Sequence, residues 1–229
     1  MGIKERYVRV SKEVADCCSA AGRDPREVRL IAVSKTVDVE GARCAFNAGS
    51  LDFGENRPDQ IVEKAAALPD ARWHFIGNIQ SRRIRDIVSS ATMIHSLYQL
   101  KHAHKIDEVA AELGKIQDVL IEVNVSGEES KSGVSPDDAA DLVLACAALP
   151  HIRVRGLMTM APQGELVVAR KCFEGLAQLK ASIAEKMDAR SAACFDELSM
   201  GMSEDWREAV AAGATMVRIG RAIFSDDFE

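Results

Sequence analysis

Residues 30–36 read Leu30-Ile31-Ala32-Val33-Ser34-Lys35-Thr36, an apolar run that ends on a single lysine. Such a run indicates a β-strand that is buried on both faces, as in a parallel sheet. In parallel α/β proteins, ligands and catalytic groups sit at the carboxyl ends of the strands, because the loops there vary while the strands hold position. Lys35 is therefore the first candidate functional residue. The alternative is a solvated lysine just past a strand end.

Seven further short apolar segments follow, and a helix-length segment separates each from the next. The predicted strands after the first are residues 51–56, 73–77, 93–97, 119–125, 152–160, 197–201 and 216–220. Helices are predicted at about 2–21, 39–48, 58–68, 139–149, 166–187 and 204–212. Strict alternation of strand and helix implies a parallel sheet, since parallel neighbours need crossover connections.

Eight strands with their helix-length connections fill a chain of 229 residues. We therefore predict an α/β fold, a single (β/α)8 TIM barrel preceded by an N-terminal helix, with one domain over residues 1–229. An open doubly wound sheet is the main alternative. It leaves some terminal elements unaccounted for, and no GxGxxG motif follows the first strand to support a dinucleotide site.

The composition is that of a soluble globular protein, with 47% hydrophobic and 28% charged residues. A net charge of −6 without a long basic run argues against binding to nucleic acid. The N-terminus lacks the apolar core of a signal peptide, and no run approaches the ~20 apolar residues of a membrane span. We therefore expect a cytoplasmic protein without a membrane segment.

Metal binding and disulfides are not expected. The six cysteines lack CxxC spacing and are interpreted as small buried hydrophobic residues. His102 and His104 are two residues apart, so on a helix they do not share a face and make a poor metal pair. His74, between two aromatic residues, is interpreted as a core histidine with satisfied hydrogen bonds rather than a ligand.

The last two predicted strands end in glycine-containing segments, Gly201-Met202-Ser203 and Arg218-Ile219-Gly220-Arg221. In barrels, the loops after strands seven and eight often bind phosphate through backbone N–H groups. Glycine permits the close approach. Ser203 is also a plausible N-cap for the helix at 204–212, so a purely structural role is the alternative.

Arg218 lies inside an apolar strand, where a buried guanidinium is costly without a partner. Its side chain either points outward between helices or faces a ligand. A lysine opposite a phosphate pocket, with an arginine between them, is the arrangement that pyridoxal 5′-phosphate (PLP) requires. The lysine forms an imine with the aldehyde, the loop amides hold the phosphate, and a polar group meets the ring nitrogen.

Several motifs, spread in order over nearly the whole chain, resemble those of one family, the pyridoxal phosphate homeostasis proteins, also called the YggS or PROSC family. They are Ala32-Val33-Ser34-Lys35-Thr36, Phe53-Gly54-Glu55-Asn56, Trp73-His74-Phe75-Ile76-Gly77, His95-Ser96-Leu97, Ser130-Lys131-Ser132-Gly133, Arg155-Gly156-Leu157-Met158-Thr159, Leu198-Ser199-Met200-Gly201-Met202-Ser203 and Val217-Arg218-Ile219-Gly220. The family fold is a single (β/α)8 barrel similar to the N-terminal domain of alanine racemase.

The resemblance implies a role for each candidate site residue. Lys35 would be the Schiff-base lysine, and Asn56 would lie beside the cofactor. Ser203 and the amides of Gly220 and Arg221 would hold the phosphate. Arg218 would face the pyridine nitrogen.

The resemblance also implies a function. Family members are regarded as carriers or regulators of cellular PLP, with no firm catalytic activity, so we expect a carrier of vitamin B6 rather than an enzyme. The partners would be the small-molecule cofactor and, in transient contacts, PLP-dependent apo-enzymes. A monomer is expected.

Four positions depart from the family pattern. Val37 stands where the family usually has a second lysine, Arg57 replaces a tyrosine, Tyr98 replaces an aspartate, and Ser225 replaces a glycine. None of these removes a proposed cofactor contact. They argue against a secondary cofactor site or exchange path that relies on extra lysines at the mouth. Lys131 is a possible second amine there and is interpreted as a solvated lysine.

Two enzymatic alternatives remain open at the level of sequence. A PLP-dependent amino-acid racemase needs a second base opposite Lys35, and Tyr98 at a strand end is the candidate. An enzyme of aldolase type acting on a phosphorylated substrate needs an acid or base within reach of Lys35. The strand ends offer few carboxylates for that role beyond Glu55 and Glu122.

Overall fold

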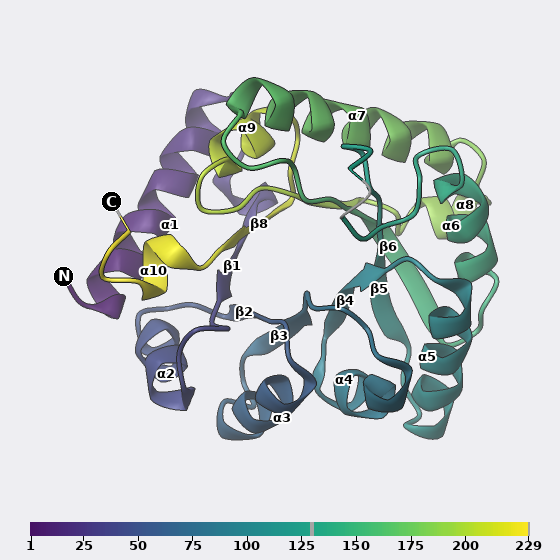
Figure 1. Cartoon of the computed structure of the whole chain (residues 1–229), viewed down its shortest axis with the longest axis horizontal. Helices are drawn as coiled ribbons and strands as arrows, with labels where there is room; N and C mark the ends of the chain where they lie inside the picture. Colours follow the sequence, from purple (N-terminus) through teal and green to yellow (C-terminus); the bar gives the residue numbers. More distant parts are fainter. Residues whose placement is uncertain (129–130, 229) are drawn as a thin grey trace.

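The computed structural model describes residues 1–128 and 131–228 and contains a closed barrel of eight parallel strands, each paired with the next and the last with the first (Figure 1). The strands are β1 (Arg29–Val33), β2 (Asp52–Glu55), β3 (Arg72–Phe75), β4 (Met93–Leu97), β5 (Gln117–Glu122), β6 (Ile152–Met158), β7 (Glu197–Ser199) and β8 (Met216–Ile219). The predicted (β/α)8 barrel is confirmed, and the open sheet is excluded because β8 pairs with β1.

Helices surround the strands as an outer ring (Figure 1). They are α1 (Ile3–Ala20), α2 (Val39–Asn47), α3 (Pro58–Ala67), α4 (Ile84–Ser90), α5 (Leu100–Glu112), α6 (Ala139–Ala147), α7 (Leu166–Ala184), α8 (Ala189–Ala192), α9 (Trp206–Ala211) and α10 (Arg221–Phe224). Two single turns of 3-10 helix, Pro25–Glu27 and Ser81–Arg83, precede β1 and α4. The predicted N-terminal helix is α1, which packs beside α10.

Side chains alternate between the inside of the barrel and the layer under the helices, as the two-residue period of a strand requires. Among the side chains inside the barrel is a cluster of six apolar ones, Ile31, Val33, Met93, Leu120, Met158 and Met216. Residues two positions further along the same strands therefore face the carboxyl-terminal mouth of the barrel. This parity directs Arg218, two residues after Met216 on β8, toward the mouth, and Lys35 follows the carboxyl end of β1.

Ion pairs close the opposite, amino-terminal end. Arg72 pairs with Asp52 at 2.6 Å and Arg153 with Asp118 at 2.6 Å, and Arg29 contacts Glu197. In barrels, this end of the strands contributes to stability rather than to function. The mouth is the candidate site.

Some predicted boundaries were wrong. β1 ends at Val33, two residues before Lys35, because Ser34 begins a turn in which the Val37 amide donates to the Ser34 carbonyl. The predicted N-cap role of Ser203 was also wrong: α9 begins at Trp206. Cys44 is exposed, contrary to the prediction for the cysteines, while Cys18, Cys146 and Cys172 are buried; all six cysteines are free.

Candidate cofactor site

Lys35 lies at the rim of the mouth, and the residue before it is held firmly. Ser34 is fully buried, its hydroxyl donates to Glu55 at 2.7 Å, and its carbonyl accepts from the Lys64 ammonium at 2.9 Å. Lys64 and Glu55 form an ion pair with no exposed surface between β2 and α3. Lys35 itself is exposed. The chain thus presents an accessible amine from a rigidly held backbone.

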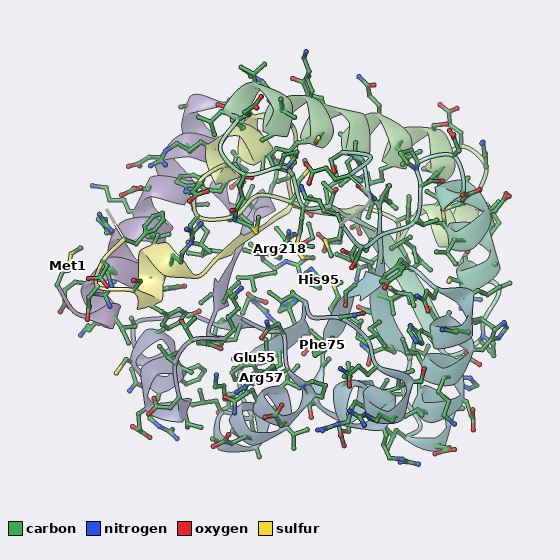
Figure 2. All side chains as sticks on the ribbon, in the orientation of Figure 1. Met1, Glu55, Arg57, Phe75, His95 and Arg218 are labelled. Atoms are coloured by element: carbon green, nitrogen blue, oxygen red, sulfur yellow. The ribbon has the colours of Figure 1, made fainter. Side chains whose placement is uncertain are left out.

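Arg218 points into the barrel, where it lies near His95 (Figure 2). Its Nη1 donates to the Ser199 hydroxyl at 2.6 Å and its Nη2 to the Thr159 carbonyl at 3.0 Å. Burial lowers the pKa of the guanidinium to about 10, which still leaves it charged at neutral pH. The sequence had left open whether Arg218 points outward, and the structure places it inside.

A line of buried polar groups continues from Arg218 toward the closed end of the barrel. Ser199 Oγ lies 2.9 Å from His95 Nδ1, and His95 Nε2 lies 2.9 Å from His74 Nδ1. His74 Nε2 lies 3.0 Å from the Asp52 carboxylate. The interpretation of His74 as a satisfied core histidine holds, but its link to Arg218 was missed.

Three backbone amides at the ends of β7 and β8 are available to a ligand. Within the described residues, the amides of Ser203, Gly220 and Arg221 donate to no protein acceptor, and neither does the Ser203 hydroxyl. The Arg221 side chain instead pairs with Glu204 at 2.8 Å. Several backbone donors at the ends of neighbouring strands suit an anion with several oxygens, so the donor set fits a phosphate group.

Two glycines allow close packing in these segments, and Gly201 also has a backbone conformation that favours glycine. A Cβ on Gly201, whose φ is +90°, would lie 2.6 Å from Ala209 Cβ and 2.9 Å from Trp206 Cα. A Cβ on Gly220 would lie 3.1 Å from the Val33 carbonyl oxygen. The loop after β7 therefore packs on α9, and the segment after β8 packs on the end of β1, next to Lys35.

Asp205 holds the loop that carries Ser203. Its carboxylate accepts from the Met202 amide at 2.6 Å, which is the contact that replaces the predicted Ser203 cap. Burial raises the pKa of Asp205, and the Met202 hydrogen bond and the charge of Arg218 oppose that shift. Ser203 is left with its hydroxyl free for the mouth.

Asn56 is exposed at the carboxyl end of β2. A Cβ on Gly77 would overlap the Asn56 carbonyl, so the loop after β3 lies directly against the Asn56 backbone. The structure therefore brings Lys35, Asn56, Ser203, Arg218, Gly220 and Arg221 to one end of the barrel, on strands β1, β2, β7 and β8.

Glu122 ends β5 and is a carboxyl group of the mouth. It is buried, and this burial raises its pKa to about 7, although the charge of Arg218 acts in the opposite direction. Glu55, the other carboxylate that the sequence offered, faces α3 and pairs with Lys64. It therefore lies outside the barrel and does not serve the mouth.

Two further candidates from the sequence are Lys131, as a second amine, and Tyr98, as a second base. Lys131 is paired with Glu128 at 3.3 Å and approaches the Met160 carbonyl, so it is not simply solvated. Tyr98 is half-buried just after β4. Among residues 1–128 and 131–228, no three His, Cys, Asp or Glu side chains form a group suited to a metal ion, and every helix is too short or too polar to cross a membrane.

This fold and mouth define a barrel of the alanine racemase N-terminal-domain class, and the model of that family, "Alanine racemase, N-terminal domain", matches residues 18–227. Two curated relatives are named pyridoxal phosphate homeostasis protein. The Aquifex aeolicus protein is 37% identical over 99% of both chains, and the Pseudomonas aeruginosa protein is 40% identical over 97% of this chain and 94% of its own. The chain belongs to the pyridoxal phosphate homeostasis protein family.

A solved structure supports the same relationship. PipY from Synechococcus elongatus, determined with PLP bound, is 32% identical, with a TM-score of 0.80 over 93% of this chain and all of PipY. The resemblance seen in the sequence is confirmed.

Proposed function

We propose that this protein binds PLP at the barrel mouth as a Schiff base on Lys35 and acts in intracellular vitamin B6 homeostasis as a carrier or regulator of the cofactor. PLP, when bound, supplies an aldehyde that condenses reversibly with an amine. Family membership and the PLP complex of PipY support this function.

The observation that carries the proposal is the arrangement at neighbouring strands β1, β7 and β8. Three amides and the Ser203 hydroxyl, which donate to no acceptor in the part of the chain that the structure describes, lie beside the strand end that leads to Lys35. The amides of Ser203, Gly220 and Arg221 would bind the phosphate, and Asn56 would border the cofactor on β2.

Arg218 favours holding the cofactor over transforming it. An arginine keeps its proton, so a ring nitrogen that accepts from it stays unprotonated and withdraws electrons weakly. Racemisation would also need a second base opposite Lys35, and Tyr98 is the candidate that assays would address. We propose a binding protein that exchanges PLP with amines and passes it, as a monomer in transient contacts, to PLP-dependent apo-enzymes.

The test is an absorption spectrum of the purified protein with added PLP, before and after borohydride reduction, followed by peptide mapping. We expect an imine band whose reduced adduct maps to Lys35 and which Lys35→Ala abolishes. Lys131→Ala is the matched control, because Lys131 lies near the mouth but is paired with Glu128. An imine band that persists in Lys35→Ala, or the absence of an imine band in the parent, would contradict the proposal.

A further inference from the structure

The polar groups inside the barrel form one continuous line from the mouth to the closed end. The contacts join Arg218 to Ser199, Ser199 to His95, His95 to His74 and His74 to Asp52, over distances of 2.6, 2.9, 2.9 and 3.0 Å. None of the five is more than 5% exposed. The proposed function uses only Arg218, which leaves four buried polar residues to be explained.

When both imidazoles are neutral, as their burial favours, the chemistry of these groups fixes the direction of every hydrogen bond. Arg218 can only donate, so the Ser199 oxygen accepts and its hydroxyl proton is free to go to His95 Nδ1. At the other end, the ionised Asp52 can only accept, so His74 carries its proton on Nε2. His74 Nδ1 then accepts from His95 Nε2. For two neutral rings, these contacts place the proton of each imidazole on Nε2.

Electrostatics agrees with this assignment. Burial lowers the pKa of His95 well below its ordinary value, and the charges of His74, Arg218 and Arg29 act in the same direction. Burial also lowers the pKa of His74, against the attraction of Asp52. Burial alone would raise the pKa of Asp52, but hydrogen bonds from His74 and Arg72 lower it to about 2.

Both ends of the line are anchored. Arg72 donates to the two Asp52 oxygens at 2.8 and 2.6 Å at the amino-terminal end of the barrel. At the mouth, the Thr159 carbonyl holds the second terminal nitrogen of Arg218. Hydrogen bonds aligned in one direction polarise one another and strengthen the chain. The other neutral tautomer of His95, protonated on Nδ1, would direct a second donor at Ser199. A protonated His95 would place a second cation close to Arg218.

We propose that Asp52, His74, His95 and Ser199 are positioning residues, a directional hydrogen-bond relay that fixes the Arg218 guanidinium for the ring nitrogen of PLP. The inference rests on the proposed function, since it is PLP that Arg218 would meet. Asp52, at the closed end of the barrel, therefore determines that the Ser199 hydroxyl donates toward His95 and accepts from Arg218, although Asp52 and Ser199 are not in contact.

Asp52→Asn tests the direction, because an amide can donate as well as accept and so permits the reversed relay. The first readout is the tautomer of each imidazole in the PLP-free protein, from long-range proton–nitrogen correlation spectra on protein labelled with nitrogen-15 histidine. The chain has five histidines, which keeps assignment tractable. We expect neutral Nε2–H forms of His74 and His95 in the parent and mixed tautomers of both in Asp52→Asn.

Arg72→Met is the matched control for that variant. It removes the ion pair at the closed end but leaves the Asp52 carboxylate as an acceptor, so the parent tautomers should persist. If the parent itself shows mixed or protonated His95, or if Asp52→Asn leaves both tautomers unchanged, the relay is overturned.

The second readout is the PLP dissociation constant, measured from the absorption of the bound cofactor. His95→Leu removes the acceptor of the Ser199 proton and should weaken PLP binding about tenfold, the effect of losing one hydrogen bond that supports a charged group. His95→Asn, whose amide oxygen can take that proton, should stay within about threefold. His102→Leu is the control, because His102 also contacts a serine, Ser81 at 3.1 Å, but outside the barrel.

The outcomes separate this inference from the proposed function. If the parent binds PLP on Lys35 and His95→Leu folds yet binds PLP as the parent does, the relay does not position Arg218. If the parent forms no Lys35 adduct, the proposed function fails, and with it the PLP part of the relay. The tautomer measurements need no PLP, so they tell these failures apart.

Discussion

Glu122 is the residue at the mouth whose protonation should control stability most directly. Its carboxyl group is 3% exposed, and the structure gives it no ion pair, within the described residues, to offset the loss of water. Burial raises its pKa from 4.5 to about 7, against the attraction of Arg218. The folded state therefore holds a proton that the unfolded chain releases.

This predicts a pH-dependent effect of Glu122→Gln in the PLP-free protein. Between the two pKa values the folded state binds more protons, so the free energy of unfolding of the parent falls as pH rises from 4.5 to about 7. The neutral amide avoids that loss. Above pH 7 the variant should be more stable by at most roughly 3 kcal/mol, and the difference should vanish below pH 4.5.

Urea unfolding at several pH values measures this difference. Glu185→Gln is the control, because Glu185 is exposed at the end of α7 and its substitution should shift stability equally at every pH. A Glu122→Gln difference that does not depend on pH would contradict the raised pKa.

At the residue scale, the sequence revealed the groups whose position is unusual for their type. Lys35 ends an apolar run of the sequence and Arg218 interrupts another, so local context alone indicated both. The relay left no such mark, since His95 and Ser199 are 104 residues apart and only closure of the barrel brings them together. The sequence also could not show that Glu55 and Glu122 face opposite sides of the barrel wall.

At the element scale, the connection from β7 to α9 determines where Ser203 lies. Gly201 has a φ of +90°, and a side chain there would collide with Ala209 and with the Trp206 backbone. Gly213, between α9 and β8, has a similar φ of +97°, but no atom of residues 1–128 or 131–228 lies within 4 Å of an added Cβ. Substitutions at these two glycines therefore distinguish the cost of backbone strain, present at both, from the cost of steric collision, present only at Gly201.

We predict that Gly213→Ala costs about 1–2 kcal/mol of unfolding free energy, from backbone strain alone. Gly201→Ala should cost roughly 2–5 kcal/mol, because overpacking adds to the same strain. It should also weaken PLP binding, since the Ser203 amide moves with the loop. Urea unfolding and PLP titration measure the two effects, and equal costs for the two variants would contradict the packing argument.

The elements themselves followed from sequence, but their ends did not. Alternation of apolar runs and helix-length segments was sufficient to predict all eight strands. The end of β1 depends on the hydrogen bond from the Val37 amide to the Ser34 carbonyl, and the start of α9 depends on the one from the Met202 amide to the Asp205 carboxylate. No periodicity in the sequence records these contacts. These ends carry Lys35 and Ser203, so the least predictable boundaries lie at the candidate site.

At the scale of the whole molecule, eight alternating units in a chain of this length predicted the closed barrel. The arrangement of the two termini was not predictable in the same way. The first and last helices, α1 and α10, lie side by side (Figure 1). The side chain of Arg6 makes this contact specific: its Nε donates to the Ile223 carbonyl at 2.7 Å, and Nη1 contacts Asp226.

Arg6 should therefore stabilise both the fold and the segment that presents the Gly220 and Arg221 amides. Arg6 is buried, so Arg6→Leu leaves the Ile223 carbonyl without its donor and should cost about 2 kcal/mol. For a chain of this size that corresponds to a fall in Tm of about 4–8 °C. PLP affinity should fall as well, because α10 begins directly after Gly220.

Arg9→Leu is the matched control on the same helix. Arg9 is exposed and makes a long 3.9 Å pair with Glu13 one turn away, an interaction worth about 0.3–0.5 kcal/mol. Its Tm should fall by less than about 2 °C. A thermal shift of that small size in Arg6→Leu would show that the contact between the first and last helices does not stabilise the fold. A lower Tm with unchanged PLP affinity would instead show that this contact stabilises the fold without positioning the phosphate site.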